Sequence, residues 1–437
     1  MQQASIHSKD RGGMVSQSPP FAVPIRYMTF GIVCFGIFAM DLAFQSHHLA
    51  SGDPGAPALV ALTHMLTLGS LLSFVMGAVY QLATVAFLIP IANVPLARIN
   101  FWLYSLSLIG LFISMSLWWA SGFLLFGGLA VVALFIYAIV MLRSLTQVKV
   151  KDVMWGFVVS AHVYLILAIT LAIVLLSVDS GAMNALSPWM NQLIATHILL
   201  AAVGFFSFLL IGFSYKLLPM FTLAHGYQTK WHRWTLILAH SAMLFLLLGI
   251  WSSMALFTWF GLVAGVCVIV LQAVSLKDMV RHRMRKKVEA PIHAVFYALT
   301  AGLLAIGLFS VASVTGGGQV SWKSVVTLYL LGWVTMTMMG FAYKIVPFLI
   351  WSKRYSHHKG PGKAPVIADL VNVSQSRPVF IGFALGVVTL TAGEISMWLP
   401  LTVFGAILTA FAILLFCIQM FRVLDLKKLG KELSDHD

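Results

Sequence analysis

Charged side chains are scarce in this chain of 437 residues: Asp, Glu, Lys and Arg together account for 9% of it, while hydrophobic residues account for 60%. A soluble domain of this length needs far more charged surface. The composition therefore excludes a soluble globular protein and predicts one that is embedded in a lipid bilayer. The formal net charge of +14 does not indicate nucleic-acid binding, because the basic residues gather in alternate loops, as orientation in a membrane requires.

Cysteine is also scarce. The chain has three cysteines, Cys34, Cys267 and Cys417, and all of them fall inside apolar segments. We expect these to be buried free thiols. The sequence has no Cys-x-x-Cys-His, which excludes a covalently attached c-type haem by its usual motif. It also has no phosphate-binding loop and no nucleophile triad motif, so no common soluble-enzyme motif identifies a substrate.

Long apolar segments fill most of the sequence, each near or above the roughly 20 residues that a helix needs to cross a bilayer. They predict an all-α membrane protein with about 12 transmembrane helices in one domain, residues 25–422. The expected spans are 27–46, 58–88, 100–120, 122–142, 154–178, 192–217, 234–253, 258–277, 291–313, 324–349, 379–398 and 401–422. Segment 1–24 has no apolar core, so we expect a disordered terminus and not a signal peptide. Residues 423–437 form a short tail.

Basic residues mark one side of the membrane. They are concentrated in four connections that contain Lys149 and Lys151; Lys230 and Arg233; Arg281, Arg283, Arg285, Lys286 and Lys287; and Lys353, Arg354, Lys359 and Lys363. In the intervening loops the one basic residue is Lys323. The positive-inside rule therefore predicts a multi-pass protein of a bacterial-type inner (cytoplasmic) membrane, with both termini and the basic loops in the cytoplasm.

A Gly-x-x-Tyr sequence ends three of the long helices: Gly77 to Tyr80, Gly212 to Tyr215 and Gly340 to Tyr343. The three copies recur at nearly equal intervals, which predicts three pseudo-repeats of four helices at about 25–146, 150–285 and 289–422. Glycine permits close helix packing in lipid, and Lys216 and Lys344 could extend to the headgroups. We interpret the tyrosines as packing corners, with contact to a substrate as the alternative.

Ionisable residues inside the bilayer are costly unless paired or liganded, so each one is a candidate site. The candidates are Asp41, His64, His162, His197, His240, His293 and Glu394. His64 and His197 precede Tyr80 and Tyr215 by nearly the same number of residues, so they should lie at one depth near the outer surface. Asp41 and Glu394 also fall in the outer parts of their helices. The other three histidines lie near the inner ends, where a structural role is favoured.

Two histidines at one depth on different helices suit axial coordination of a haem, or part of a copper site. Interhelical hydrogen bonding is the alternative for this pair. Any haem would be a non-covalent b-type haem, because the covalent motif is missing.

The three-times-four plan, with a histidine high in the second helix, resembles the catalytic subunit (subunit I) of haem–copper oxidases. The likeness in motif is greatest around residues 63–82 and 331–343. It implies that His64 matches the second-helix ligand of the low-spin haem and that His197 matches the first copper ligand. The departures are Ala201 in place of a tyrosine, Leu246 to Ile250 in place of a His-His pair, and Thr327, Leu328 and Tyr329 where the family has histidines. A complete oxygen-reducing centre cannot be assembled from these residues.

Three functions stay open at this point. The first is a membrane haemoprotein for electron transfer or for O2 or NO handling, an oxidoreductase of the cytochrome oxidase or nitric oxide reductase type if it is an enzyme, with copper as a further candidate metal. The second is a proton- or metal-coupled transporter that uses Asp41, Glu394 and the histidines. The third is an assembly subunit that keeps the scaffold without its chemistry. The expected partners are the bilayer and a second membrane subunit or electron donor, and no nucleic acid.

Overall fold

The computed structural model describes residues 19–51, 55–316, 322–356 and 365–434. This part of the chain is almost entirely helical, and its one β-bridge joins Ala224 to Arg283. It contains 12 helices long and apolar enough to cross a membrane, as the sequence predicted. Single helices form the spans α2 (Ala22–Phe44), α6 (Val94–Leu117), α9 (Val153–Asp179), α12 (Lys230–Ser252), α13 (Ala255–Arg281), α14 (Ala290–Thr315) and α18 (Leu399–Leu424).

The other five spans join several helical pieces end to end. They are α4, η1 and α5 (Pro57–His64, Met65–Leu72, Ser73–Phe87); α7, η2 and α8 (Ala120–Gly122, Phe123–Gly127, Gly128–Leu145); η3, α10, η4 and α11 (Asn184–Trp189, Met190–Ile198, Leu199–Ser207, Phe208–Thr222); α15, η5 and α16 (Trp322–Thr327, Leu328–Thr335, Met336–Arg354); and η7 and α17 (Val373–Gln375, Ser376–Ser396). Short helices α3 (Ser46–Ser51), η6 (Ile367–Asp369) and α19 (Leu426–Ser434) lie between or after the spans.

Helices α2 and α6 begin earlier than the sequence predicted, because their first residues include polar ones. Helix α2 begins at Ala22, inside the segment expected to be disordered, whose first 18 residues lie outside the described part. Helix α6 begins several residues early because the Asn93 side chain accepts a hydrogen bond from the Leu96 N–H at 2.9 Å, which caps the helix. Apolar content alone cannot locate such a cap.

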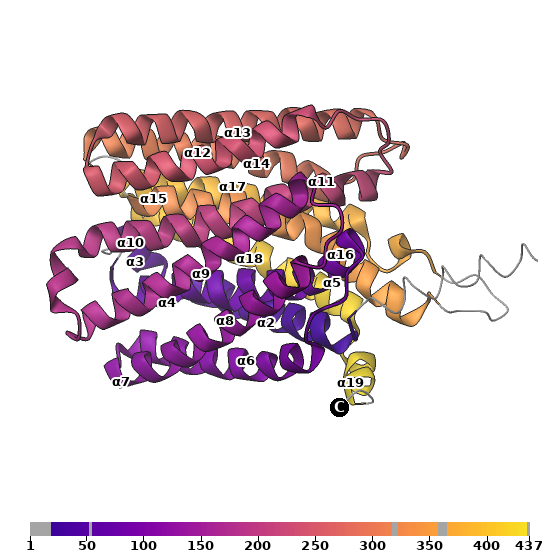
Figure 1. The fold of residues 1–437 in the computed structure, drawn as a ribbon, viewed down its shortest axis with the longest axis horizontal. Coiled ribbons are helices and arrows are strands. Elements are labelled where there is room, and N and C mark those ends of the chain that lie inside the picture. The colour runs from indigo at the N-terminus through magenta and orange to yellow at the C-terminus, as the bar shows by residue number, and fades with distance from the viewer. Residues whose placement is uncertain (1–18, 52–54, 317–321, 357–364, 435–437) are drawn as a thin grey trace, which may run out of the picture.

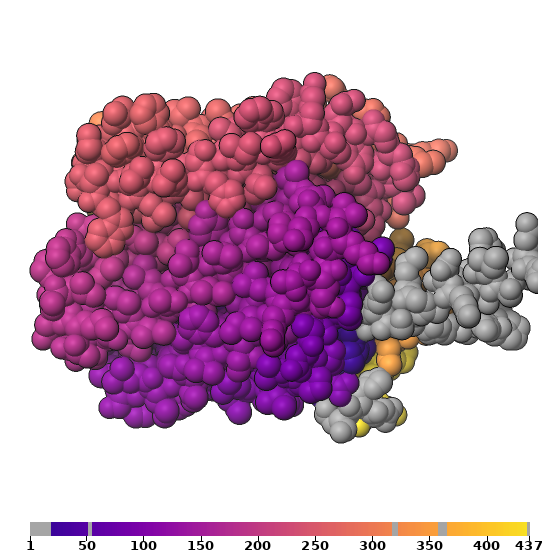
Figure 2. All heavy atoms as spheres, viewed as in Figure 1, coloured from indigo at the N-terminus to yellow at the C-terminus, as the bar shows by residue number. Residues whose placement is uncertain are grey.

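Three spans form the interior of the bundle. In Pro57–Phe87, Asn184–Thr222 and Trp322–Arg354, 67%, 61% and 83% of the most apolar stretch is buried, against at most 56% in the other nine described spans. The remaining helices surround them: α12 and α13 lie along one edge and α6 along the opposite edge (Figure 1). The space-filling view shows the same order, with residues of α12 and α13 forming a layer above the rest (Figure 2).

Each interior span changes from α-helix to π-helix and back, at η1, η4 and η5. A π-helical turn leaves carbonyl groups without their usual partner, and in lipid another donor must satisfy them. The Tyr104 hydroxyl donates to the carbonyl oxygen of Leu68 in η1 at 2.7 Å, and the Tyr329 hydroxyl donates to that of Ala202 in η4 at 3.3 Å. In η5, Thr335 donates to the Leu330 carbonyl at 2.8 Å. Side-chain hydroxyl groups therefore donate hydrogen bonds to carbonyl groups in η1, η4 and η5.

The glycines of the three Gly-x-x-Tyr sequences lie where two backbones come close. A Cβ atom built on Gly77 would lie 2.5 Å from the Pro24 carbonyl oxygen, and one on Gly340 would lie 2.7 Å from that of Pro291. On Gly212 it would lie 2.6 Å from the Phe157 Cβ. Each neighbour belongs to the beginning of α2, α14 or α9, so the three glycines make the same kind of contact.

We expect Gly340→Ala to destabilise the protein, because its new methyl group meets the backbone of α14. Overpacking of this kind costs about 1–3 kcal/mol. The melting temperature of the purified protein in detergent, followed by size-exclusion fluorescence, measures the effect. The matched control is Gly36→Ala, where a Cβ has no heavy atom within 4 Å. Equal melting temperatures for the two variants would contradict the close contact.

Candidate functional site

His64 is the last residue of α4 and His197 is the last but one of α10, and each of these helices leads into a π-helical stretch. The Nδ1 atom of His64 lies 2.8 Å from the Val60 carbonyl oxygen, and that of His197 lies 3.0 Å from the Ala168 carbonyl oxygen of α9. Because a carbonyl oxygen only accepts, Nδ1 carries the proton in both rings and Nε2 holds the lone pair. Within the described residues neither Nε2 atom has a hydrogen-bond partner.

The two histidines come from two different interior spans, and they are near enough for an electrostatic interaction. Both side chains are half-buried. Each of these two spans therefore carries one imidazole with an open Nε2 atom shortly before its π-helical stretch.

Of the other three intramembrane histidines, His293 is exposed at the start of α14, while His162 and His240 have both ring nitrogens bonded. His162 is fully buried, donates from Nδ1 to the Val158 carbonyl at 2.7 Å and accepts at Nε2 from the Tyr137 hydroxyl at 3.2 Å. His240 contacts the Ser160 hydroxyl at 3.1 Å and the Tyr164 hydroxyl at 2.9 Å. Neither ring keeps a lone pair for a ligand, which favours a structural role for both.

The three motif tyrosines have different surroundings. Tyr343 donates to the Gln419 side chain at 2.7 Å. The Tyr80 and Tyr215 hydroxyls are buried with no hydrogen-bond partner in the described part of the chain. Tyr215 stacks on His232, with ring centroids 3.8 Å apart and planes inclined by 14°. The sequence analysis missed His232 because it stands between Lys230 and Arg233 and reads as part of a basic loop.

Glu394 on α17 is the most deeply buried of the acidic candidates, with 2% of its surface exposed. Its Oε1 atom accepts a hydrogen bond from Thr327 at 3.1 Å, and its Oε2 atom has no partner among the described residues. Lys323, which donates to the Leu49 carbonyl, lies within electrostatic reach. Thr327 ends α15 directly before η5, as His64 ends α4 directly before η1. Asp41 on α2 is half-buried and accepts from Gln45 at 3.3 Å.

The ligands that His64 and His197 offer are imidazole nitrogens. Among the described residues no group of three or more His, Cys, Asp and Glu side chains could hold a metal ion. An imidazole with a bonded Nδ1 atom and an open Nε2 atom is a type of ligand that haem iron accepts.

No protein-family model matches the chain, and no curated protein sequence matches it. The resemblance to the oxidase subunit therefore stays a prediction from the quoted motifs. The hydrogen bonds of His64 and His197 do not depend on that resemblance.

The polar group around Tyr329 yields a stability prediction. Its hydroxyl lies 2.5 Å from that of Ser207, which also accepts from the Trp333 indole at 2.7 Å. Tyr329→Phe leaves the Ala202 carbonyl without a donor, which costs about 1–3 kcal/mol. We expect a lower melting temperature than for Tyr297→Phe, whose ring is 54% exposed on α14. Equal melting temperatures for the two variants would show that another group donates to the Ala202 carbonyl of η4.

Proposed function

We propose that the protein is an integral membrane haemoprotein that holds one non-covalent b-type haem between His64 and His197. The observation that carries the proposal is the pair of open Nε2 atoms, supplied by two interior spans within electrostatic reach of each other. His162 and His240, by contrast, use both ring nitrogens in hydrogen bonds within the protein.

The carbonyl partners of the two rings support ligation. An Nδ1–H bond to a backbone carbonyl fixes the ring orientation and makes the opposite nitrogen a better ligand. The Val60 carbonyl belongs to the same helix as His64, while the Ala168 carbonyl reaches His197 from α9. Each imidazole is therefore held in place before any ligand binds.

The pseudo-repeat plan also supports the proposal. Each of the three π-helical stretches precedes a Gly-x-x-Tyr corner, and π-helical turns are frequent at functional sites. In this plan the first and second repeats supply histidines, and the third supplies Thr327 with Glu394. The basic loops face the cytoplasm under the positive-inside rule, so the histidines lie toward the outer surface.

A haem with two imidazole ligands supplies one-electron transfer. The chain holds the two rings, excludes water with apolar helices and offers no third ligand group among the described residues. Electron transfer therefore fits these residues better than reduction of O2 does. Handling of O2 or NO would require one imidazole to leave the iron.

We expect His64→Ala and His197→Ala each to remove or convert the reduced-minus-oxidised haem spectrum, because each removes one axial ligand. The wild-type protein, purified in detergent from cells supplied with haem precursors, should carry one b-type haem per chain by pyridine haemochrome. His240→Ala is the matched control and should keep the spectrum.

An unaltered spectrum in both histidine variants would overturn the ligand assignment. Wild-type protein without haem would overturn the haemoprotein proposal itself. Monodisperse size-exclusion profiles for all three variants distinguish a lost ligand from a lost fold.

A proton-coupled transporter is the second candidate, because the Glu394 carboxyl is buried with one oxygen atom unpartnered among the described residues. In liposomes under an imposed pH gradient, Glu394→Gln should abolish any proton flux of the wild-type protein, since an amide cannot carry the proton. Asp179→Asn, at the exposed end of α9, serves as the control. Wild-type flux in the Glu394→Gln variant would exclude that carboxyl from a transport path.

A further inference from the structure

A hollow of about 840 Å³ opens at the basic end of the bundle, where α14 and α17 begin. Its walls come from two stretches, around residues 287–290 and 368–377. Its volume lies within the range of about 300–1,000 Å³ that small-molecule sites occupy. It lies at the end of the bundle opposite the histidine pair, so its ligand is independent of the proposed haem.

Two cations line this hollow without partners. Lys287 and Arg377 are exposed, and within the described part of the chain neither has a hydrogen bond or an ion pair. An anion that entered the hollow could therefore pair with both cations without breaking an existing hydrogen bond or ion pair.

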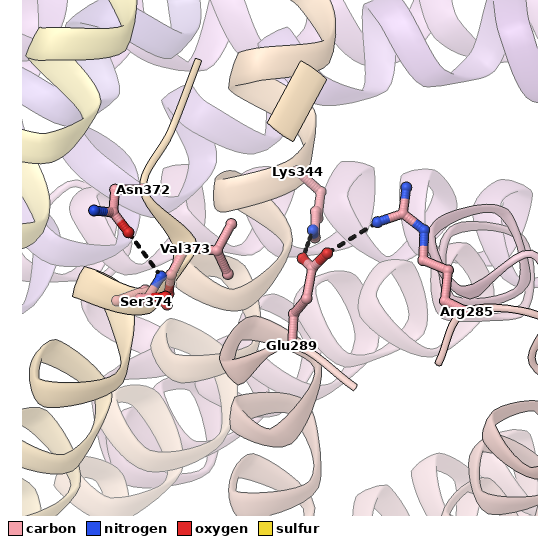
Figure 3. Close-up of polar contacts among 7 residues, drawn as sticks. Arg285, Glu289, Lys344, Asn372, Val373 and Ser374 are labelled. Atoms are coloured by element: carbon pink, nitrogen blue, oxygen red, sulfur yellow. Dashed lines mark hydrogen bonds and ion pairs between the residues drawn. The ribbon is translucent and has the colours of Figure 1, made fainter. Parts of the chain in front are cut away.

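The acidic residues of the hollow are already engaged. The Glu289 carboxylate receives Arg285 at 2.9 Å on one oxygen and pairs with Lys344 through the other, as Figure 3 shows. Asp369 accepts a hydrogen bond from the Val366 N–H at 2.9 Å. The lining holds two basic and two acidic residues, and Arg285 and Lys344 add two positive charges beside Glu289, so the charge around the hollow is positive.

The N-terminal ends of two helices add partial positive charge at the hollow. Helix α14 begins at Ala290, and η7 leads directly into α17, so the positive ends of two long helices border the hollow. In Figure 3 the side chains of Glu289 and Lys344 point toward each other, and the Ser374 N–H donates to the Asn372 side chain at 3.1 Å at the start of η7. Backbone dipoles and basic side chains together favour a phosphate group.

We propose that this hollow binds a phosphate-bearing anion, and that the headgroup of an anionic phospholipid is the source its position favours. Both helices that begin there are membrane spans, so the hollow lies at the level where the bilayer ends. Basic hollows between spans at this level suit phospholipid headgroups. A soluble phosphate compound offers the same chemistry and is the other source.

The test uses the full chain in a neutral detergent. The melting temperature and native mass spectra are recorded with phosphatidylglycerol, with phosphatidylcholine, and with inorganic phosphate or ATP. We expect phosphatidylglycerol to remain bound and to raise the melting temperature, and phosphatidylcholine not to. The Lys287→Ala/Arg377→Ala variant should weaken that binding at least about tenfold, because two charge-assisted contacts are lost.

The control variant Lys286→Ala/Lys427→Ala removes the same charge from exposed positions outside the hollow. Equal weakening in both double variants would overturn the proposal, because it would mean general attraction to a basic surface. Equal binding of phosphatidylcholine, or binding of none of the ligands, would also overturn it. Phosphate or ATP binding that is lost only in Lys287→Ala/Arg377→Ala would support the site and assign it to the soluble source.

Discussion

Inside a bilayer, each backbone carbonyl that leaves the regular α-helical pattern needs a donor from the protein, and the interior of this bundle depends on that requirement. The three most buried spans each contain such a departure, in η1, η4 and η5. Tyr104 donates to η1 and Tyr329 to η4 from other helices, while Thr335 donates within η5 itself. The π-helical geometry of η1 and η4 is therefore supported by the packed bundle and not by one helix alone.

The same requirement explains how the histidine rings are held. Each π-helical stretch begins at or just after the histidine, and each ring donates to a carbonyl within reach. In η1 the carbonyl that needs a partner, that of Leu68, is served by Tyr104 and lies within 3.1 Å of the Ser73 hydroxyl. Hydroxyl groups donate to the π-helical carbonyls, and the Nε2 atoms, which carry a lone pair and no proton, stay open.

Hydropathy predicted all twelve spans because lipid demands a continuous apolar length, which is a local property of the sequence. Nearly equal distances from the motif tyrosines predicted one depth for His64 and His197, and each residue lies shortly before a π-helical stretch in the structure. The stretches η1 and η4 could not be predicted, because Tyr104 and Tyr329, which donate to their carbonyl groups, are distant in sequence. For the same reason the sequence did not separate Lys216, which is exposed, from Lys344, which pairs with Glu289.

The third interior span differs from the other two in a way that bears on function. Where His64 ends α4, Thr327 ends α15, and its hydroxyl donates to the buried Glu394. Threonine cannot ligate haem iron as imidazole does, so the third span adds no axial ligand. The other two interior spans carry His64 and His197, whose open Nε2 atoms are the ligands of the proposed haem. The third interior span instead brings Thr327 to a buried carboxyl group within electrostatic reach of Lys323. Under the proposed function, two interior spans would serve electron transfer, and the third would leave the Glu394 carboxyl as a group that could bind a proton.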